Sequence, residues 1–147
     1  RVWPGQALLK HVLAHAPDKS VTLLLLSSLK DTALFLRNHE QLFATKVQGV
    51  TFMGGVSRES VERGGPLVPD EASHNVCFDL EASRFAFQRL QDLGVPMVII
   101  SRFAAYGCPT GRHIYDLMVR SPVPHPVACR VYCAQRNNIN RLWADVC

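Results

Sequence analysis

The chain has 147 residues, 48% of them hydrophobic, and a formal net charge of +4. That length allows one domain with a sizeable core, and that composition excludes a disordered chain. The basic residues are scattered, with no cluster and no interleaved aromatic residues, so the sequence gives no support for a nucleic-acid surface. The longest apolar stretches, around residues 21–26 and 95–100, are far too short to cross a membrane, and no membrane association is expected.

The cysteines and histidines are possible metal ligands. The five cysteines are an odd number without disulfide-framework spacing, which favours an intracellular, reducing compartment. Cys129 and Cys133 lie four residues apart, as do His11 and His15, and that spacing in a helix can place two ligands on one face. Neither pair has the further ligands that a metal site needs. We therefore interpret the cysteines as small buried residues and the histidines as part of an exposed polar helix face.

The first part of the chain alternates helical and extended patterns. Apolar spacing predicts a helix, a strand, a helix and a strand over residues 5–16, 21–26, 29–44 and 47–52. The first strand is apolar except for Thr22, which is typical of a strand covered on both faces. Gly54 and Gly55 follow the second strand and indicate a sharp turn, where backbone can approach a ligand closely.

The segment between Gly54 and His74 is the least regular part of the sequence. It contains four glycines and two prolines, with charged residues between them. A loop of about twenty residues inside a compact domain is unusual, and such loops are often functional or mobile. We interpret it either as a flap that covers a site or as a plain surface loop.

The remaining patterns complete an α/β arrangement. Asp79 is a predicted N-cap for a helix over residues 80–92, and residues 95–100 form a third predicted strand. Strands separated by helices of crossover length predict parallel pairing. Beyond Ser101 the pattern is helical, with a helix over residues 111–119, a proline-rich break, and a last helix that begins near Pro126.

These patterns predict a Rossmann-like, open, mainly parallel sheet flanked by helices, followed by a helical C-terminal part. We expect one domain over residues 1–147, with its α/β core at 20–105 and a helical extension at 106–147. Residue 1 is Arg, and no signal peptide precedes the first helical pattern. We therefore expect the chain to be a processed product or a portion of a longer protein.

A series of short motifs lies in the middle of the chain. The second strand ends in Met53-Gly54-Gly55, Asn75 follows the irregular segment, and the next helix begins Asp79-Leu-Glu-Ala82. This succession resembles the inosine-uridine nucleoside hydrolase family, which typically reads Met-Gly-Gly, then Ala-Glu-Phe-Asn, then Asp-Pro-Glu-Ala-Ala. The family's Gly-Val-Pro and apolar strand also match residues 94–100. The resemblance covers roughly residues 20–105.

The resemblance implies hydrolysis of the N-glycosidic bond of a ribonucleoside. In the family, an aspartate cluster holds a calcium ion that binds the ribose hydroxyls and the attacking water, and one aspartate is the general base. This chemistry suits a transition state that resembles an oxocarbenium ion, because carboxylates stabilise its positive charge. Calcium in turn prefers carboxylate and carbonyl oxygen ligands.

The matching positions imply a sugar pocket. Met53 matches the methionine that lines the pocket, with Gly54 beside it, and Asn75 matches the asparagine that hydrogen-bonds ribose. Leu26 falls about where the family lends a main-chain carbonyl to calcium. Asp79 resembles the family's structural helix cap and not a catalytic acid. Met53, Gly54 and Asn75 are therefore the expected substrate-binding residues.

The chain departs from the family at the catalytic positions. The aspartate cluster should lie upstream of Val21, where no two aspartates are adjacent, and Ser73 replaces the glutamate two positions before the ribose asparagine. Asp70 and Glu71 lie nearby, but their spacing does not match that glutamate. The family's downstream His-Asp pair would fall near or past Cys147, too late to be His113 and Asp116.

We consequently assign no catalytic residue and no metal ligand to the chain, and we expect no activity and no cofactor from it alone. Calcium and a ribonucleoside are expected only where the complete family site exists. The first hypothesis is the central portion of a nucleoside hydrolase of purine or pyrimidine salvage. The second is a degenerate, non-catalytic scaffold or binding subunit in a homo-oligomer or larger assembly. An unrelated Rossmann-like nucleotide binder is disfavoured, because no Gly-x-Gly-x-x-Gly fingerprint is present.

Overall fold

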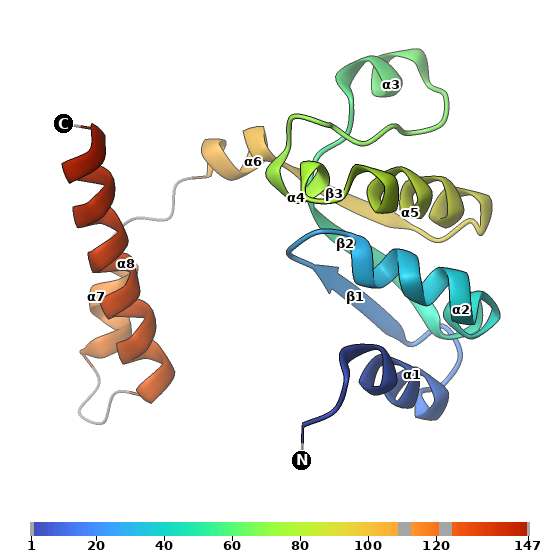
Figure 1. The fold of residues 1–147 in the computed structure, drawn as a ribbon, viewed down its shortest axis with the longest axis horizontal. Helices are drawn as coiled ribbons and strands as arrows, with labels where there is room; N and C mark the ends of the chain where they lie inside the picture. Colours follow the sequence, from blue (N-terminus) through green and yellow to red (C-terminus); the bar gives the residue numbers. More distant parts are fainter. Residues whose placement is uncertain (1, 109–112, 121–124, 147) are drawn as a thin grey trace. The chain divides into compact units, whose positions relative to one another are not determined.

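A computed structural model describes residues 2–108, 113–120 and 125–146. The chain divides into two compact units, residues 1–107 and 108–147, which we describe separately (Figure 1). The division lies two residues beyond the predicted end of the α/β core. The expectation that residues 1–147 form one domain remains a prediction.

Unit 1 contains a small sheet and the helices that surround it. Its elements are, in chain order, α1 (Gly5–His15), β1 (Val21–Leu25), α2 (Lys30–Lys46), β2 (Val47–Gly54), α3 (Arg58–Arg63), α4 (His74–Cys77), α5 (Leu80–Asp92), β3 (Met97–Ser101) and α6 (Arg102–Gly107). The strands pair in the order β1-β2-β3, and both pairs are parallel. The predicted α/β, Rossmann-like fold with parallel strands is thus confirmed.

The core lies between one face of the sheet and two helices. Val50 and Phe52 of β2 point into it, and Phe52 meets Phe87 of α5 edge to face with ring centroids 5.9 Å apart. From α2 the core receives Phe35, which is fully buried. Apolar residues of α5 recur at helical spacing, so that one stripe of this helix is buried against the sheet. Figure 1 shows α2 and α5 side by side over the same face.

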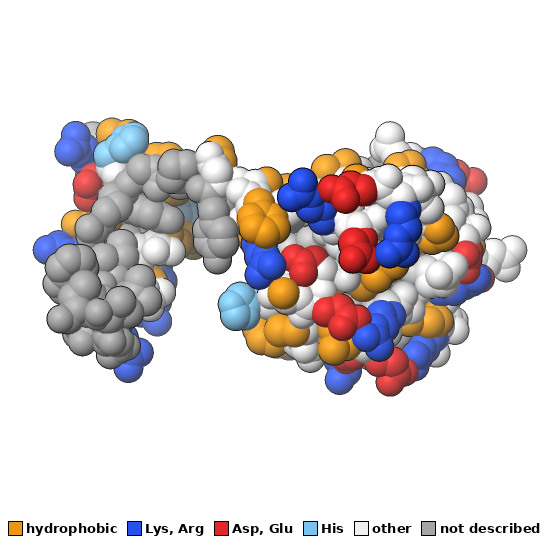
Figure 2. Space-filling model, turned by 90° about the horizontal axis from the view of Figure 1, so that it is seen from above, with side chains coloured by type: hydrophobic (Ala, Val, Ile, Leu, Met, Phe, Trp, Pro, Cys, Tyr) orange, Lys and Arg blue, Asp and Glu red, His pale blue; other side chains and the backbone are white. Residues whose placement is uncertain are grey.

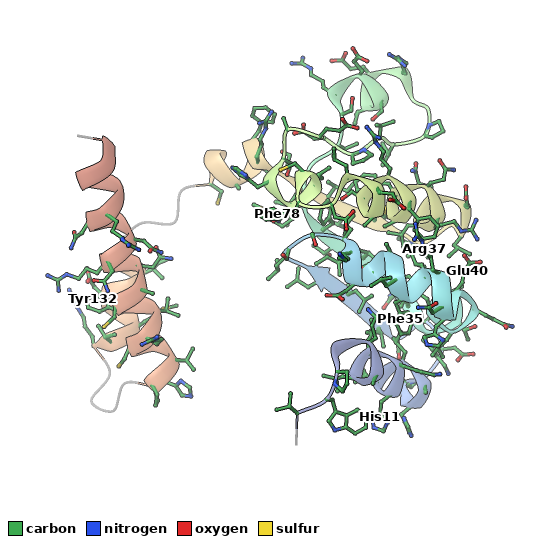
Figure 3. All side chains as sticks on the ribbon, in the orientation of Figure 1. His11, Phe35, Arg37, Glu40, Phe78 and Tyr132 are labelled. Carbon is green, nitrogen blue, oxygen red and sulfur yellow. The ribbon has the colours of Figure 1, made fainter. Side chains whose placement is uncertain are left out.

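The junction between α2 and α5 carries two ion pairs, from Arg37 to Glu81 (3.0 Å) and from Arg89 to Glu40 (2.6 Å). Arg37 and Glu40 lie on the side of α2 that is turned towards α5 (Figure 3). Hydrogen bonds to Glu40 and then to Asp92 raise the pKa of Arg89. Asp79 caps α5 as predicted, since its Oδ1 accepts a hydrogen bond from the Ala82 N–H (3.0 Å).

The expectation that the first strand is covered on both faces is wrong for the described chain. Residues of β1 alternate between half-buried and exposed, and Leu24 is 62% exposed. The strand order explains the difference. The strands are added in the order β1-β2-β3, each on the same side of the one before it. Because both connections are right-handed crossovers, their helices α2 and α5 lie on the same face of the sheet. These two helices therefore leave the opposite face uncovered.

The irregular segment also contains structure that the sequence did not predict. Residues 58–63 form α3, which is stabilised by the i,i+4 ion pairs Arg58–Glu62 and Arg63–Glu59, each 2.8 Å. The segment returns to the end of β2 through an antiparallel bridge between Val56 and Pro69. The segment therefore contains a short helix, and the stretches before and after this helix are joined by the Val56–Pro69 bridge.

Unit 2 consists of α7 (His113–Val119) and α8 (Pro126–Val146), which pack against each other. The predicted helical character of the C-terminal part is confirmed for the described residues; residues 111 and 112 of the first predicted helix lie outside them. The prediction of buried cysteines is wrong here: Cys133 is exposed and Cys129 only partly buried. On α8, Arg136 Nη1 donates a hydrogen bond to the hydroxyl oxygen of Tyr132 (3.2 Å), one turn away; Tyr132 is labelled in Figure 3.

Two surface properties bear on partners. On the face that Figure 2 shows, basic and acidic side chains of unit 1 stand next to one another. Among the described residues, no helix is both long enough and apolar enough to cross a membrane.

Candidate ribose-binding site

The candidate site lies at the carboxyl ends of two neighbouring strands. The ends of β2 and β3 are aligned, with Met53 beside Ile100 and Gly54 beside Ser101. In open α/β sheets, ligands bind outside the carboxyl ends of the strands. The residues that the motifs singled out are gathered at this edge.

Asn75, on the short helix α4, connects the ends of two strands. Its Nδ2 donates a hydrogen bond to the main-chain oxygen of Met53 (2.6 Å) and a longer one to that of Leu26 (3.3 Å), and it lies 3.5 Å from the Met53 sulfur. Leu26, Met53 and Asn75, far apart in the sequence, are thus brought together. Because the amide nitrogen faces main-chain oxygens, Asn75 Oδ1 is left as the acceptor for a ligand hydroxyl.

Ser73 holds α4 against β2. Its side chain is buried, and its Oγ donates a hydrogen bond to the main-chain oxygen of Gly54 (2.8 Å). This residue replaces a glutamate of the resembled family. Its hydroxyl is used within the protein, so it does not supply the additional ribose contact of that glutamate.

The paired glycines are required by close packing. A Cβ atom at Gly54 would lie 2.2 Å from ring atoms of Phe52, and one at Gly55, where φ is +156°, would lie 3.0 Å from the Asp70 Cβ. The Gly55 main-chain oxygen also accepts a hydrogen bond from the Asp70 N–H (3.1 Å). The predicted sharp turn is therefore present, whereas close approach of a ligand to it remains a prediction.

Two cavities open at this edge of the sheet. The smaller, of about 140 Å³, is lined by Met53, Gly54, Ala72, Ser73, His74, Asn75, Arg102 and Ala105. The larger, of about 810 Å³, lies beside α3 and the end of β3. We call them the asparagine cavity and the α3 cavity. His74 is exposed, and it also lines the asparagine cavity.

Arg102 is the residue of this site that the sequence analysis missed. It is the first residue after β3, and its Nε lies 3.4 Å from Asp70 Oδ2. The available signal was its place two residues after the end of a predicted strand. Glu71 forms an ion pair with Arg84. The two carboxylates near the site, Asp70 and Glu71, are therefore both matched by arginines.

The described residues do not form a calcium cage. No three His, Cys, Asp or Glu side chains come together as metal ligands in the described part of the chain. The Leu26 main-chain oxygen, the position that the resemblance relates to calcium, accepts a hydrogen bond from Asn75. His11 and His15 stack with ring centroids 4.3 Å apart, and His15 Nδ1 lies 2.8 Å from the His11 main-chain oxygen.

Comparison with known proteins places the fold. No protein family model and no curated protein sequence matches the chain. Two solved structures match it at 27% identity and a TM-score of 0.84, each over 97% of this chain: the effector protein XOO4466, and the type III effector protein XopQ complexed with adenosine diphosphate ribose. The chain covers 38% and 39% of those chains, respectively.

A third structure is an inosine-uridine preferring nucleoside hydrolase from Bacillus anthracis. It is 21% identical, with a TM-score of 0.56, over 82% of this chain and 38% of that one. The chain therefore spans about two fifths of the length of the structures that it matches. It has a nucleoside hydrolase-like fold, as the motif resemblance predicted.

Proposed function

We propose that unit 1 forms the ribose-binding wall of a nucleoside hydrolase-like protein whose ligand is a ribonucleoside. The observation that carries this proposal is the meeting of Leu26, Met53 and Asn75 at the carboxyl ends of the strands. The fold shared with a nucleoside hydrolase supports it. So does the adenosine diphosphate ribose bound to XopQ, since that molecule contains ribose.

The wall offers two kinds of contact to a sugar. Asn75 Oδ1 accepts a hydrogen bond from a ribose hydroxyl, because its amide nitrogen is already held by the Met53 and Leu26 oxygens. The Met53 side chain, beside the amide, supplies a polarisable surface for the carbon face of the ring. These contacts position a ribose without performing chemistry on it.

Hydrolysis would need groups beyond this wall. Cleaving an N-glycosidic bond builds positive charge on the sugar, and carboxylates together with an activated water make that step possible. The carboxylates of Asp70 and Glu71 face arginines. In this proposal, the general base and the calcium ligands of an active enzyme of nucleoside salvage come from outside the described residues.

A non-catalytic, hydrolase-like binding subunit is the second candidate. The Ser73 side chain favours it, because its hydroxyl is used on the Gly54 oxygen and does not restore the missing glutamate. The same ribose wall then serves for recognition in a scaffold or larger assembly, and no base is released.

The proposal is tested by measuring ribonucleoside binding and nucleobase release with the intact protein. Titration calorimetry with inosine and uridine measures binding. Asn75→Ala should weaken binding about tenfold, because it removes the proposed hydrogen bond from a ribose hydroxyl to Asn75 Oδ1. Ser83→Ala is the matched control, since Ser83 Oγ donates a buried hydrogen bond to the Val76 oxygen but lines neither cavity. That variant should bind normally.

Base release, followed chromatographically with and without a calcium chelator, separates the two candidates. Release that the chelator and Asn75→Ala both abolish supports the enzyme. Binding without release supports the recognition subunit. Ribonucleoside binding that Asn75→Ala leaves unchanged contradicts the ribose wall itself.

A further inference from the structure

Arg102 stands in the wall that the two cavities share. Met53 and Asn75 line the asparagine cavity, and the α3 cavity lies beside α3 and the end of β3. Among the described residues, Arg102 and Ala72 are the two that line both cavities. A ligand that occupied both cavities would therefore lie beside Arg102 and Ala72.

The guanidinium has few hydrogen bonds within the described part of the chain. Its Nε is buried and makes none there, and its Nη1 donates one long bond to the Ala72 oxygen (3.5 Å). The Phe103 ring supports it, with the guanidinium carbon 5.0 Å from the ring centre. An arginine held in place with unused N–H donors presents the planar fork that recognises phosphate.

We propose that Arg102 forms a phosphate subsite, so that the site takes a ribonucleoside phosphate in preference to the neutral ribonucleoside. This inference rests on the proposed function, because the ribose in the asparagine cavity places the phosphate. The α3 cavity beside this subsite is lined by apolar residues such as Val61, Val68 and Phe103.

The other charges around the α3 cavity define what competes with a phosphate. Arg58 is paired with Glu62 (2.8 Å), and Glu71 is paired with Arg84. Asp70 is the carboxylate that faces Arg102, with Oδ2 3.4 Å from Nε. A bound phosphate therefore competes with Asp70 for one cation. Removing the Asp70 charge and removing the Arg102 charge should change affinity in opposite directions.

The experiment compares adenosine with AMP on the intact protein by titration calorimetry. The wild-type protein should bind AMP more tightly than adenosine. Arg102→Gln should weaken AMP binding about tenfold to a hundredfold more than it weakens adenosine binding, the usual cost of a lost hydrogen bond to a charged group. Asp70→Asn should tighten AMP binding severalfold, while its Oδ1 remains to accept from the Ala72 N–H (3.1 Å).

Two further variants control for charge and folding. Arg37→Gln removes a cation that is paired with Glu81 and lines neither cavity, so AMP binding should not change. Arg102→Lys keeps the charge without the planar fork and should lose part of the AMP preference. It also replaces Arg102→Gln if that variant does not fold.

Three results would overturn the subsite: equal wild-type affinity for AMP and adenosine, equal weakening of both by Arg102→Gln, or weakening of AMP binding by Asp70→Asn. If adenosine binding still depends on Asn75, the ribose wall stands and the phosphate subsite alone fails. If neither ligand binds, both proposals fail.

Discussion

The two faces of the sheet in unit 1 differ, although the same three strands make both. On the covered face, Val50 and Phe52 are 2% and 3% exposed, whereas Leu24 and Val98 on the open face are 62% and 60% exposed. The contrast runs along β2 itself. Phe52 packs into the core, while the next residue, Met53, points to the other face and reaches Asn75. If the proposed ribose wall is correct, alternate residues of one strand serve stability and ligand binding.

The largest effect should come from emptying the covered face. Phe87→Ala removes a fully packed ring that meets Phe52 from α5, and it should lower the free energy of unfolding of the 147-residue chain by about 3–5 kcal/mol. Urea denaturation followed by circular dichroism measures this loss. A change below about 1 kcal/mol would show that α5 does not pack on the sheet as described.

The next largest effect should come from a side chain added at the last residue of β2. Gly54→Ala places a Cβ 2.2 Å from the Phe52 ring and should cost about 1–3 kcal/mol through overpacking. Gly65→Ala is the control, because a Cβ there meets nothing within 4 Å. Equal unfolding free energies for the two variants would argue against the close contact of Gly54 and Phe52.

Loss of a helix cap should have a smaller effect. Asp79→Ala removes the acceptor for the Ala82 N–H and should cost about 1 kcal/mol of unfolding free energy. Asp79→Asn keeps an acceptor oxygen and should retain most of that stability. Thermal denaturation of the two variants measures the difference, and an asparagine variant no more stable than the alanine variant would contradict the cap.

The smallest effect is expected on the open face. Leu24→Ser changes a residue that is 62% exposed and should alter the unfolding free energy of the 147-residue chain by no more than about 0.5 kcal/mol. Measured beside Phe87→Ala, it tests the asymmetry of the sheet directly. A loss of several kcal/mol would mean that the face is covered in this chain.

Local sequence patterns predicted the three strands of unit 1 and the helices α1, α2 and α5, but they could not predict which faces of the strands are buried. The apolar run at residues 21–26 is the same whether one face of its strand is buried or both, and the outcome depends on the side on which the crossovers place α2 and α5. The α3 helix carries i,i+4 pairs such as Arg58–Glu62, a signal that glycines and prolines on either side of it obscured.

The candidate site was only partly accessible from sequence. Met53 and Asn75 belong to a short motif, so the order of residues alone was enough to name them. Arg102 belongs to none of these motifs. It reaches the site because the parallel register aligns the end of β3 with the end of β2 and places it beside Asp70 of the intervening segment. Such a juxtaposition follows from tertiary structure alone.

The most direct test of the account is a crystal structure of the intact protein with adenosine bound. The account predicts a ribose hydroxyl within about 3.2 Å of Asn75 Oδ1, with the sugar against the Met53 side chain. A ribose bound elsewhere on the protein, with neither Met53 nor Asn75 in contact with it, would contradict it.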